Sequence, residues 1–87
     1  MTKAELAALT DVRGYAAAGR ISITNHAAVR MVERNVKPRD VRSALVSARA
    51  CKDQRNGTWK VTGPDTDGDA LDVVVAIEDG VLVVTVF

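Results

Sequence analysis

The spacing of apolar residues changes once along this 87-residue chain, and that change limits the folds open to it. Before about residue 50, apolar side chains recur every three or four positions, which is the period of an amphipathic helix. Beyond that point they alternate with polar ones or run in short continuous stretches, as in β-strands. The order predicts an α+β fold in which N-terminal helices pack on one face of a C-terminal antiparallel sheet of about four strands.

The first helix is marked at both ends. Thr2 and Glu5 have the spacing of a capping box, which predicts that the helix begins near residue 3, and Gly19 is expected to end it. Residues 21–24 are expected to form a short extended link. One apolar stripe faces the core: Ala8, Leu9, Val12, Tyr15 and Ala16.

Two shorter helices are expected next. Asn25 is a good N-cap for a helix that runs to about Arg34, and Asn35 suits a left-handed exit. Pro38 fits the first turn of a third helix. Its inward positions are Val41, Ala44, Leu45 and Ala48, and its outward positions are Arg39, Arg42 and Arg49.

The second half of the sequence predicts two β-hairpins. An edge strand at 50–54 leads through an Asn-Gly turn to a strand at 58–62, and residues 71–87 form a hairpin around 78–80. The face expected toward the helices carries Leu71, Val73, Val75, Ile77, Leu82, Val84 and Val86. The opposite face, expected to be mixed in polarity, carries Thr58, Lys60, Asp72, Val74, Ala76, Val83, Thr85 and Phe87.

Size and composition indicate a single domain, 1–87, in which 1–20 is an added helix. Cys51 has no second cysteine to pair with, which favours a reducing compartment. The longest apolar run is far shorter than a membrane span, so we expect a cytoplasmic protein with no membrane partner. No spacing of side chains indicates a metal or another cofactor.

Charge is divided along the chain. Residues 30–60 carry nine basic and three acidic side chains, and residues 61–87 carry six acidic and no basic ones. A basic middle segment is able to bind a polyanion such as RNA. The two zones are equally able to neutralise each other across the folded domain.

The second helix holds the only histidine of the chain. At about 100° per residue, His26, Arg30, Glu33 and Arg34 share one polar arc. Near the helix N-terminus the dipole favours the neutral imidazole, which can act as a base. The alternative is a solvated face on which Arg30 and Glu33 form an ordinary i,i+3 pair.

Other chemical features are weaker. The stretch Asp65–Asp69 resembles a calcium loop, but the positions that need Gly and Glu hold Ala70 and Ala76, so a hairpin loop is the better interpretation. Lys60 and Thr85 are able to position a phosphate, although both types are common on strand surfaces.

Taken together, the H-A-x-x-R-M-x-E-R block, the G-x-W-K-V-x-G strand and the closing V-x-V-V-T-V-F resemble the small prokaryotic family catalogued as domain of unknown function 4258. That family is similar in fold to RelE-type toxins, a group with BrnT-like and MqsR-like proteins. The resemblance covers about residues 21–87.

The resemblance implies a RelE-like fold and a toxin of a type II toxin–antitoxin pair, a metal-independent endoribonuclease that cleaves RNA by 2′-OH attack. An antitoxin encoded nearby and RNA, free or ribosome-bound, would be its partners. His26, Arg30, Arg34 and Glu33 would be catalytic, and Lys60 and Thr85 would bind substrate. The alternative is a non-catalytic protein-interaction or RNA-binding module of the same fold.

Overall fold

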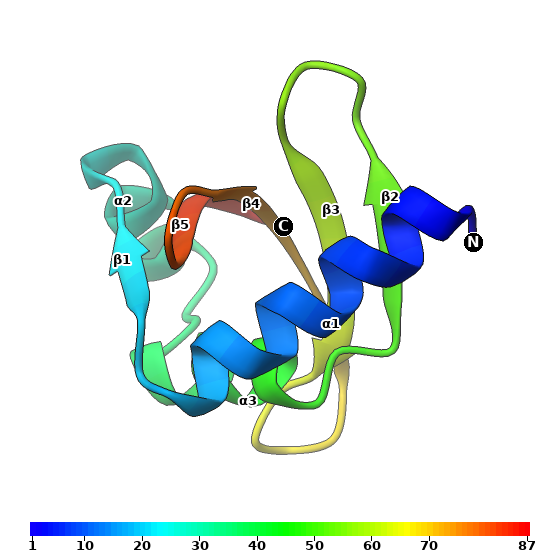
Figure 1. The fold of residues 1–87 in the computed structure, drawn as a ribbon. Helices are drawn as coiled ribbons and strands as arrows, with labels where there is room; N and C mark the ends of the chain where they lie inside the picture. Colours follow the sequence, from blue (N-terminus) through cyan, green and yellow to red (C-terminus); the bar gives the residue numbers. More distant parts are fainter.

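A computed structural model describes all of residues 1–87, and its first helix, α1, spans Lys3–Ala17. The capping box is confirmed, because the Thr2 hydroxyl accepts from the Glu5 amide at 3.1 Å and the Glu5 carboxylate accepts from the Thr2 amide at 2.7 Å. The predicted apolar stripe faces the core. Helix α1 lies across the sheet beside α3 (Figure 1).

The segment after α1 is not a link but a strand, β1 (Ile21–Ile23), which pairs in parallel with the last strand. Helix α2 follows at Asn25–Glu33. Its N-cap is Thr24 rather than Asn25, since the Thr24 hydroxyl accepts from the Ala27 amide at 3.0 Å and Asn25 is already helical. Asn35 adopts the predicted left-handed conformation, with φ of 54°.

Helix α3 spans Pro38–Val46 and has Pro38 in its first turn, as predicted. The remaining strands are β2 (Ala50–Asp53), β3 (Trp59–Pro64), β4 (Ala70–Ile77) and β5 (Val81–Val86). The sheet therefore has five strands, in the order β1-β5-β4-β3-β2, and is mixed rather than antiparallel with four. The α+β class and the helices ahead of the main sheet are confirmed.

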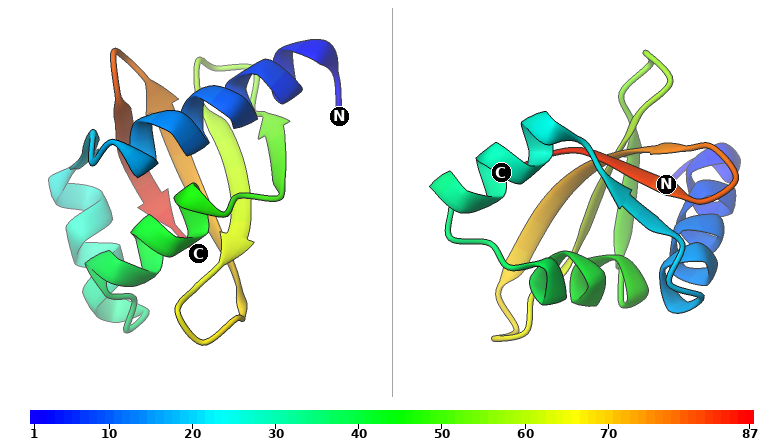
Figure 2. Two further views of the ribbon diagram at one scale, coloured as in Figure 1. Left: turned by 60° about the horizontal axis from the view of Figure 1, so that its bottom comes forward. Right: turned by 90° about the vertical axis from the view of Figure 1, so that its left-hand side faces the viewer.

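Helices α1 and α3 cover one face of the sheet, and α2 packs against β5 (Figure 2). The core between them is aliphatic, and its largest fully buried side chains belong to Val12, Val41, Leu45, Val61, Val73, Val75, Val83 and Val86. We call the other side the outer face. It carries Lys60, Thr62, Asp72, Val74, Ala76, Leu82, Val84 and Thr85, all half-buried.

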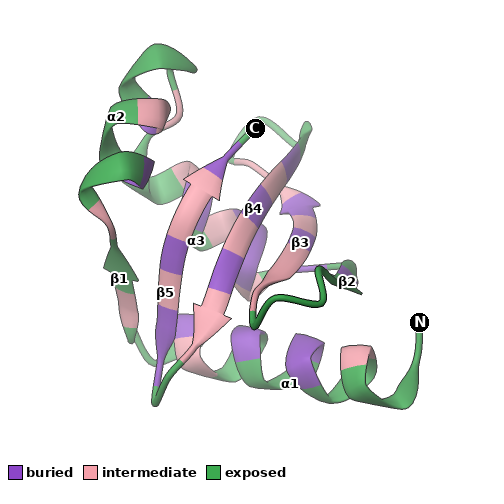
Figure 3. Ribbon diagram, turned by 90° about the horizontal axis from the view of Figure 1, so that it is seen from above, coloured by how far each residue is buried: buried purple, intermediate pink, exposed green.

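A β-bulge in β5 makes part of the predicted face assignment wrong. Val74 pairs with Thr85, but the next residue of β4, Val75, pairs with Val83, so Val84 is an extra residue. Val83 and Val86 are therefore both buried in the core, while Val84 is half-buried on the outer face. Figure 3 shows the buried and half-buried positions along β4 and β5. Strict alternation placed Val83 outside and Leu82 and Val84 inside, and all three are the reverse.

The β2–β3 hairpin turns at the predicted place, over Arg55, Asn56 and Gly57. The Gln54 amide donates to the Thr58 carbonyl at 3.1 Å, so that three residues form the tip. Arg55 and Gly57 take positive φ of 64° and 84° within it. Strand β2 lies at a sheet edge, as predicted.

The N-terminus of α1 protects this β2 edge. The amide of Cys51 donates to the sulfur of Met1 at 3.3 Å, and that of Asp53 donates to the Glu5 carboxylate at 2.9 Å. Hydrogen bonds from Thr2 and then Asp53 lower the pKa of Glu5. Burial and, to a smaller extent, the nearby carboxylates of Glu5 and Asp53 raise the pKa of the Cys51 thiol to about 11, so Cys51 is an inert core residue.

Asp40 connects α3 to the β3–β4 loop. Its carboxylate accepts from the Thr66 hydroxyl at 2.5 Å, the Thr66 amide at 3.1 Å and the Lys37 amide at 3.0 Å. These bonds, that of the Thr66 hydroxyl foremost, lower the pKa of Asp40 from 3.8 to about 2. The ionised carboxylate of Asp40 is thus more stable in the folded state than in the unfolded state.

Acid titration is expected to remove this connection. Because the folded-state pKa of Asp40 is depressed, its stabilising contribution is present above about pH 4 and is lost as the pH falls toward 2. Thermal melts of wild type and Asp40→Asn from pH 7 to pH 2 check this. The wild type should melt higher at pH 7, and the two curves should converge near pH 2. A constant gap over the whole range would contradict the assignment.

Candidate functional site

Helix α2 presents the candidate side chains, and its N-terminus is held against β5. The Thr24 amide donates to the Val83 carbonyl at 3.1 Å, and the Thr24 hydroxyl donates to the Val84 carbonyl at 3.3 Å. His26 follows in the first turn of the helix and is exposed. The bulged stretch of β5 thereby sets the position of His26.

Two flanks of α2 differ in chemistry. Ala27 and Met31 point into the core. With a turn of about 100° per residue, Arg30 and Arg34 lie on one flank of that buried side, and His26 lies next to Arg30. The opposite flank is apolar, formed by Ala28 and Val32.

The apolar flank lies on the helix-covered side of the sheet. Ala28 and Val32 line a recess of about 550 Å³ with Ile23 and with the turn that leads into α3. Ile23 is the register partner of Val83, whose side chain is in the core, so Ile23 points to the same side. The basic flank is on the other side of α2, and it is consequently directed toward the outer face of the sheet.

Arg30 and Glu33 form an ion pair of 3.5 Å, with 31% and 56% of their side chains exposed. An exposed pair at this spacing contributes about 0.3–0.5 kcal/mol. Glu33 is therefore a poor candidate for a free base, while Arg30 keeps donors for a second anion. Arg34 caps the C-terminus of α2 and has no ion pair.

Lys60 and Thr85 lie in one row across the outer face. Lys60 pairs with Val74, and Val74 pairs with Thr85. The row extends to Lys52 in β2, the register partner of Lys60. Like charges directly opposite each other destabilise a sheet, and neither lysine has a carboxylate partner. Two adjacent unpaired ammonium groups favour the binding of an anion.

The sequence analysis missed Lys52. A signal was present, since counting outward from the Asn56 position of the hairpin places residues 52 and 60 opposite each other. The prediction that Lys60 and Thr85 share a face is consistent with this row, and the roles of all six candidates stay a prediction.

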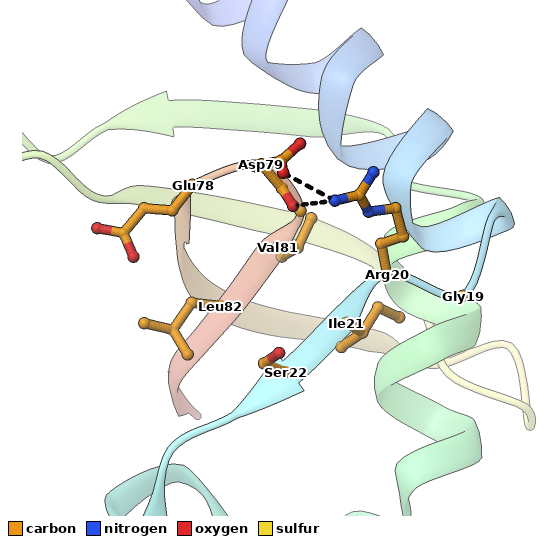
Figure 4. A pocket seen from close by; sticks show the side chains of 9 residues that line it. Gly19, Arg20, Ile21, Ser22, Glu78, Asp79, Val81 and Leu82 are labelled. Atoms are coloured by element: carbon orange, nitrogen blue, oxygen red, sulfur yellow. Dashed lines mark hydrogen bonds and ion pairs between the residues drawn. The ribbon is translucent and has the colours of Figure 1, made fainter.

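A polar recess of about 350 Å³ lies at the far end of the β1–β5 pair (Figure 4). The Arg20 guanidinium reaches across from the start of β1 to the β4–β5 turn. It contacts the Asp79 carboxylate at 3.0 Å and donates to its carbonyl at 2.7 Å. The pair joins two turns, and neither this recess nor the one beside α2 contains any of the six predicted site residues.

The side chains able to bind a metal are dispersed over the structure. The structure holds no group of three or more His, Cys, Asp or Glu side chains arranged around one point. Asp65–Asp69 forms a hairpin loop in which the Asp65 carboxylate accepts from the amides of Asp67 and Asp69, both at 2.9 Å. None of the three helices combines the length and the apolar character that a membrane crossing demands.

The chain is therefore a small α+β domain with a cation-bearing sheet face beside a basic helix flank. It belongs to the family described as a domain of unknown function (DUF4258), whose profile matches residues 23–87, most of the chain. The family resemblance is confirmed, and the relationship to RelE-type toxins stays a prediction. No curated protein and no solved structure matched the chain.

Proposed function

We propose that this protein is a metal-independent endoribonuclease that acts as the toxin of a type II toxin–antitoxin pair in the cytoplasm. The supporting observation is that the basic flank of α2 and the Lys52–Lys60–Thr85 row lie toward the same side of the sheet. Phosphate contacts need cations, and this side offers several without carboxylate partners. An antitoxin encoded nearby would cover this side.

The chemistry requires few groups. His26 accepts the proton of a ribose 2′-OH, whose oxygen then attacks the adjacent phosphorus. The bond to the 5′-oxygen breaks, and that oxygen takes a proton from water. Arg30 and Arg34 stabilise the charge on the phosphate through their planar guanidinium groups. The products are a 2′,3′-cyclic phosphate and a 5′-OH end.

The lysine row positions the RNA rather than cleaving it. Lys60 and Lys52 neutralise backbone phosphates, and Thr85 supplies a hydroxyl for a further hydrogen bond. Aromatic side chains for stacking bases are scarce, with only one Trp, one Tyr and one Phe in the chain. This scarcity favours RNA presented by the ribosome over free RNA.

A non-catalytic module is the second candidate, because the six proposed residues line no recess. Such a module would bind a protein or RNA through the outer face. The surface probe for that binding is Val84→Asp, since Val83 belongs to the core and its replacement tests folding instead.

Controlled expression in a bacterial host separates the two functions. The wild type should arrest growth and produce RNA ends with 2′,3′-cyclic phosphate and 5′-OH. His26→Ala should restore growth and lower cleavage by about 10²–10⁴-fold, the usual contribution of a general base. Because His26 is exposed, the melting temperature should not change.

A matched control is Val29→Ala, also an exposed change on α2, which removes no charged or titratable side chain and should retain cleavage. Lys52→Ala and Lys60→Ala should weaken RNA binding and reduce its salt dependence by about one counterion each. Intact RNA in the presence of folded wild type, both with and without ribosomes, would contradict the enzymatic function.

A further inference from the structure

The two edges of the sheet are treated differently by the rest of the chain. At β2, the outward amides of Cys51 and Asp53 are bound by Met1 and Glu5. Edge strands that are capped in this way do not pair with other chains. The opposite edge, β1, has no comparable cover.

The backbone of β1 leaves one row of groups unpaired. The Arg20 carbonyl accepts from the Val81 amide at 2.9 Å, and the Thr24 amide donates to the Val83 carbonyl at 3.1 Å. Because alternate residues of a strand point to alternate neighbours, Ser22 also faces β5, whereas Ile21 and Ile23 direct their N–H and C=O groups away from it. No side chain of the protein bonds to these four groups.

An apolar recess adjoins this edge. It measures about 550 Å³ and is lined by Ile23, by the Ala28–Met31–Val32 side of α2 and by Val36 and Pro38. Val32 is 83% exposed and Ile23 is 38% exposed. Exposed branched side chains around a hollow are typical of a surface that binds a partner's apolar side chains.

The charge beside the recess is positive. Lys37 is its only charged lining residue. The nearby carboxylates are already engaged, since Glu33 pairs with Arg30 and Asp40 binds Lys37 and Thr66 backbone amides. An occupant of the recess would therefore be favoured if it carried acidic groups next to apolar ones.

We propose that the free edge of β1 binds an extended, acidic segment of a partner protein, which adds a sixth strand to the sheet. Its backbone pairs with Ile21 and Ile23, an apolar side chain enters the recess, and a carboxylate lies near Lys37. A second copy of this chain fits less well, because its own edge segment, residues 20–24, carries no carboxylate to place near Lys37. This surface is distinct from the RNA-binding side and does not depend on the ribonuclease function.

The test uses the full chain and a fluorescent heptapeptide, Glu-Thr-Val-Thr-Ile-Thr-Glu, with blocked ends, followed by polarisation. Alternate residues of an extended chain share a face, so its Glu side chains lie on the same face as Val and Ile. Val32→Glu should weaken binding by about tenfold or more, and Lys37→Glu should do the same for this peptide. A peptide with Lys in place of Glu should bind Lys37→Glu better than wild type. Val29→Glu introduces the same charge at an exposed residue of α2 that does not line the recess, so it is the matched control and should bind as wild type does.

Backbone methylation tests strand addition directly. Two versions of the peptide carry N-methyl groups on alternate residues, so that each blocks one edge of the extended chain. One version should bind and the other should lose binding. Equal binding of the two methylated peptides would overturn the proposal. So would an equal loss of peptide binding in Val29→Glu and Val32→Glu, or a dimer of the chain formed through β1. His26→Ala should bind the peptide normally, which separates this result from that of the RNA assay.

Discussion

Val83→Asp is expected to unfold the domain, while Val84→Asp, one residue further along, leaves it folded. Val83 is fully buried between the sheet and the helices, and Val84 is the extra residue of the bulge on the outer face. A carboxylate at the Val83 position would lose its hydration with no partner nearby, at a cost of about 5 kcal/mol or more. A domain of this size has little more stability than that.

Circular dichroism melts and native-state hydrogen exchange measure the difference. Val83→Asp should show no cooperative melting transition at neutral pH, and Val84→Asp should melt within a few degrees of wild type. If both variants melted alike, the register of β5 would be wrong. The pair also decides how the outer face is probed, because only Val84→Asp changes that surface without removing the fold.

Gly63→Ala is expected to lower the melting temperature by more than about 10 °C. A Cβ atom at Gly63 would overlap the Ala44 carbonyl oxygen and lie 2.8 Å from the Ala44 carbonyl carbon. Both are backbone atoms of α3, so no side-chain rotation relieves the contact. Moving α3 away from β3 would open the core and would cost about 3 kcal/mol.

Gly14→Ala is the matched control for this change. Gly14 lies in α1 with no atom within 4 Å of an added Cβ, so alanine there has only its higher helix propensity to contribute. It should raise the stability by about 1 kcal/mol. A substantial loss at Gly14, or tolerance at Gly63, would contradict the packing of α3 on β3.

Local patterns predicted the helices well because the signals that form a helix lie within a few residues. The capping box at Thr2, the left-handed exit at Asn35 and the proline at the start of α3 all involve neighbours in sequence. Burial followed the helical stripes for the same reason. The predicted boundary at Asn25 was wrong by one residue because Thr24 and Asn25 are both good caps.

The sheet was predicted less well because strand pairing is decided by distant segments. Ile21–Ile23 is too short to be identified as a strand without its partner β5, which lies 60 positions away in register. The bulge at Val84 could not be predicted either. The residues around it are all apolar or Thr, so no alternation of polar and apolar side chains shows where the strand changes register. Of the site, α2 could be read from its helical spacing, whereas the row from Lys52 to Thr85 depended on strand order.

The position of β5 has a consequence for the order in which the domain assembles. The strand nearest the C-terminus is not at an edge but lies between β1 and β4, so it alone connects the β1–α2 unit to the rest of the sheet. Pairing β1 with β5 closes the segment of 60 positions between Ile21 and Val81. Closing so long a segment costs chain entropy before any contact between the two strands forms. Hairpins β2–β3 and β4–β5 close over short turns and can form first. We therefore expect His26 and the open edge of β1 to reach their final positions late in folding.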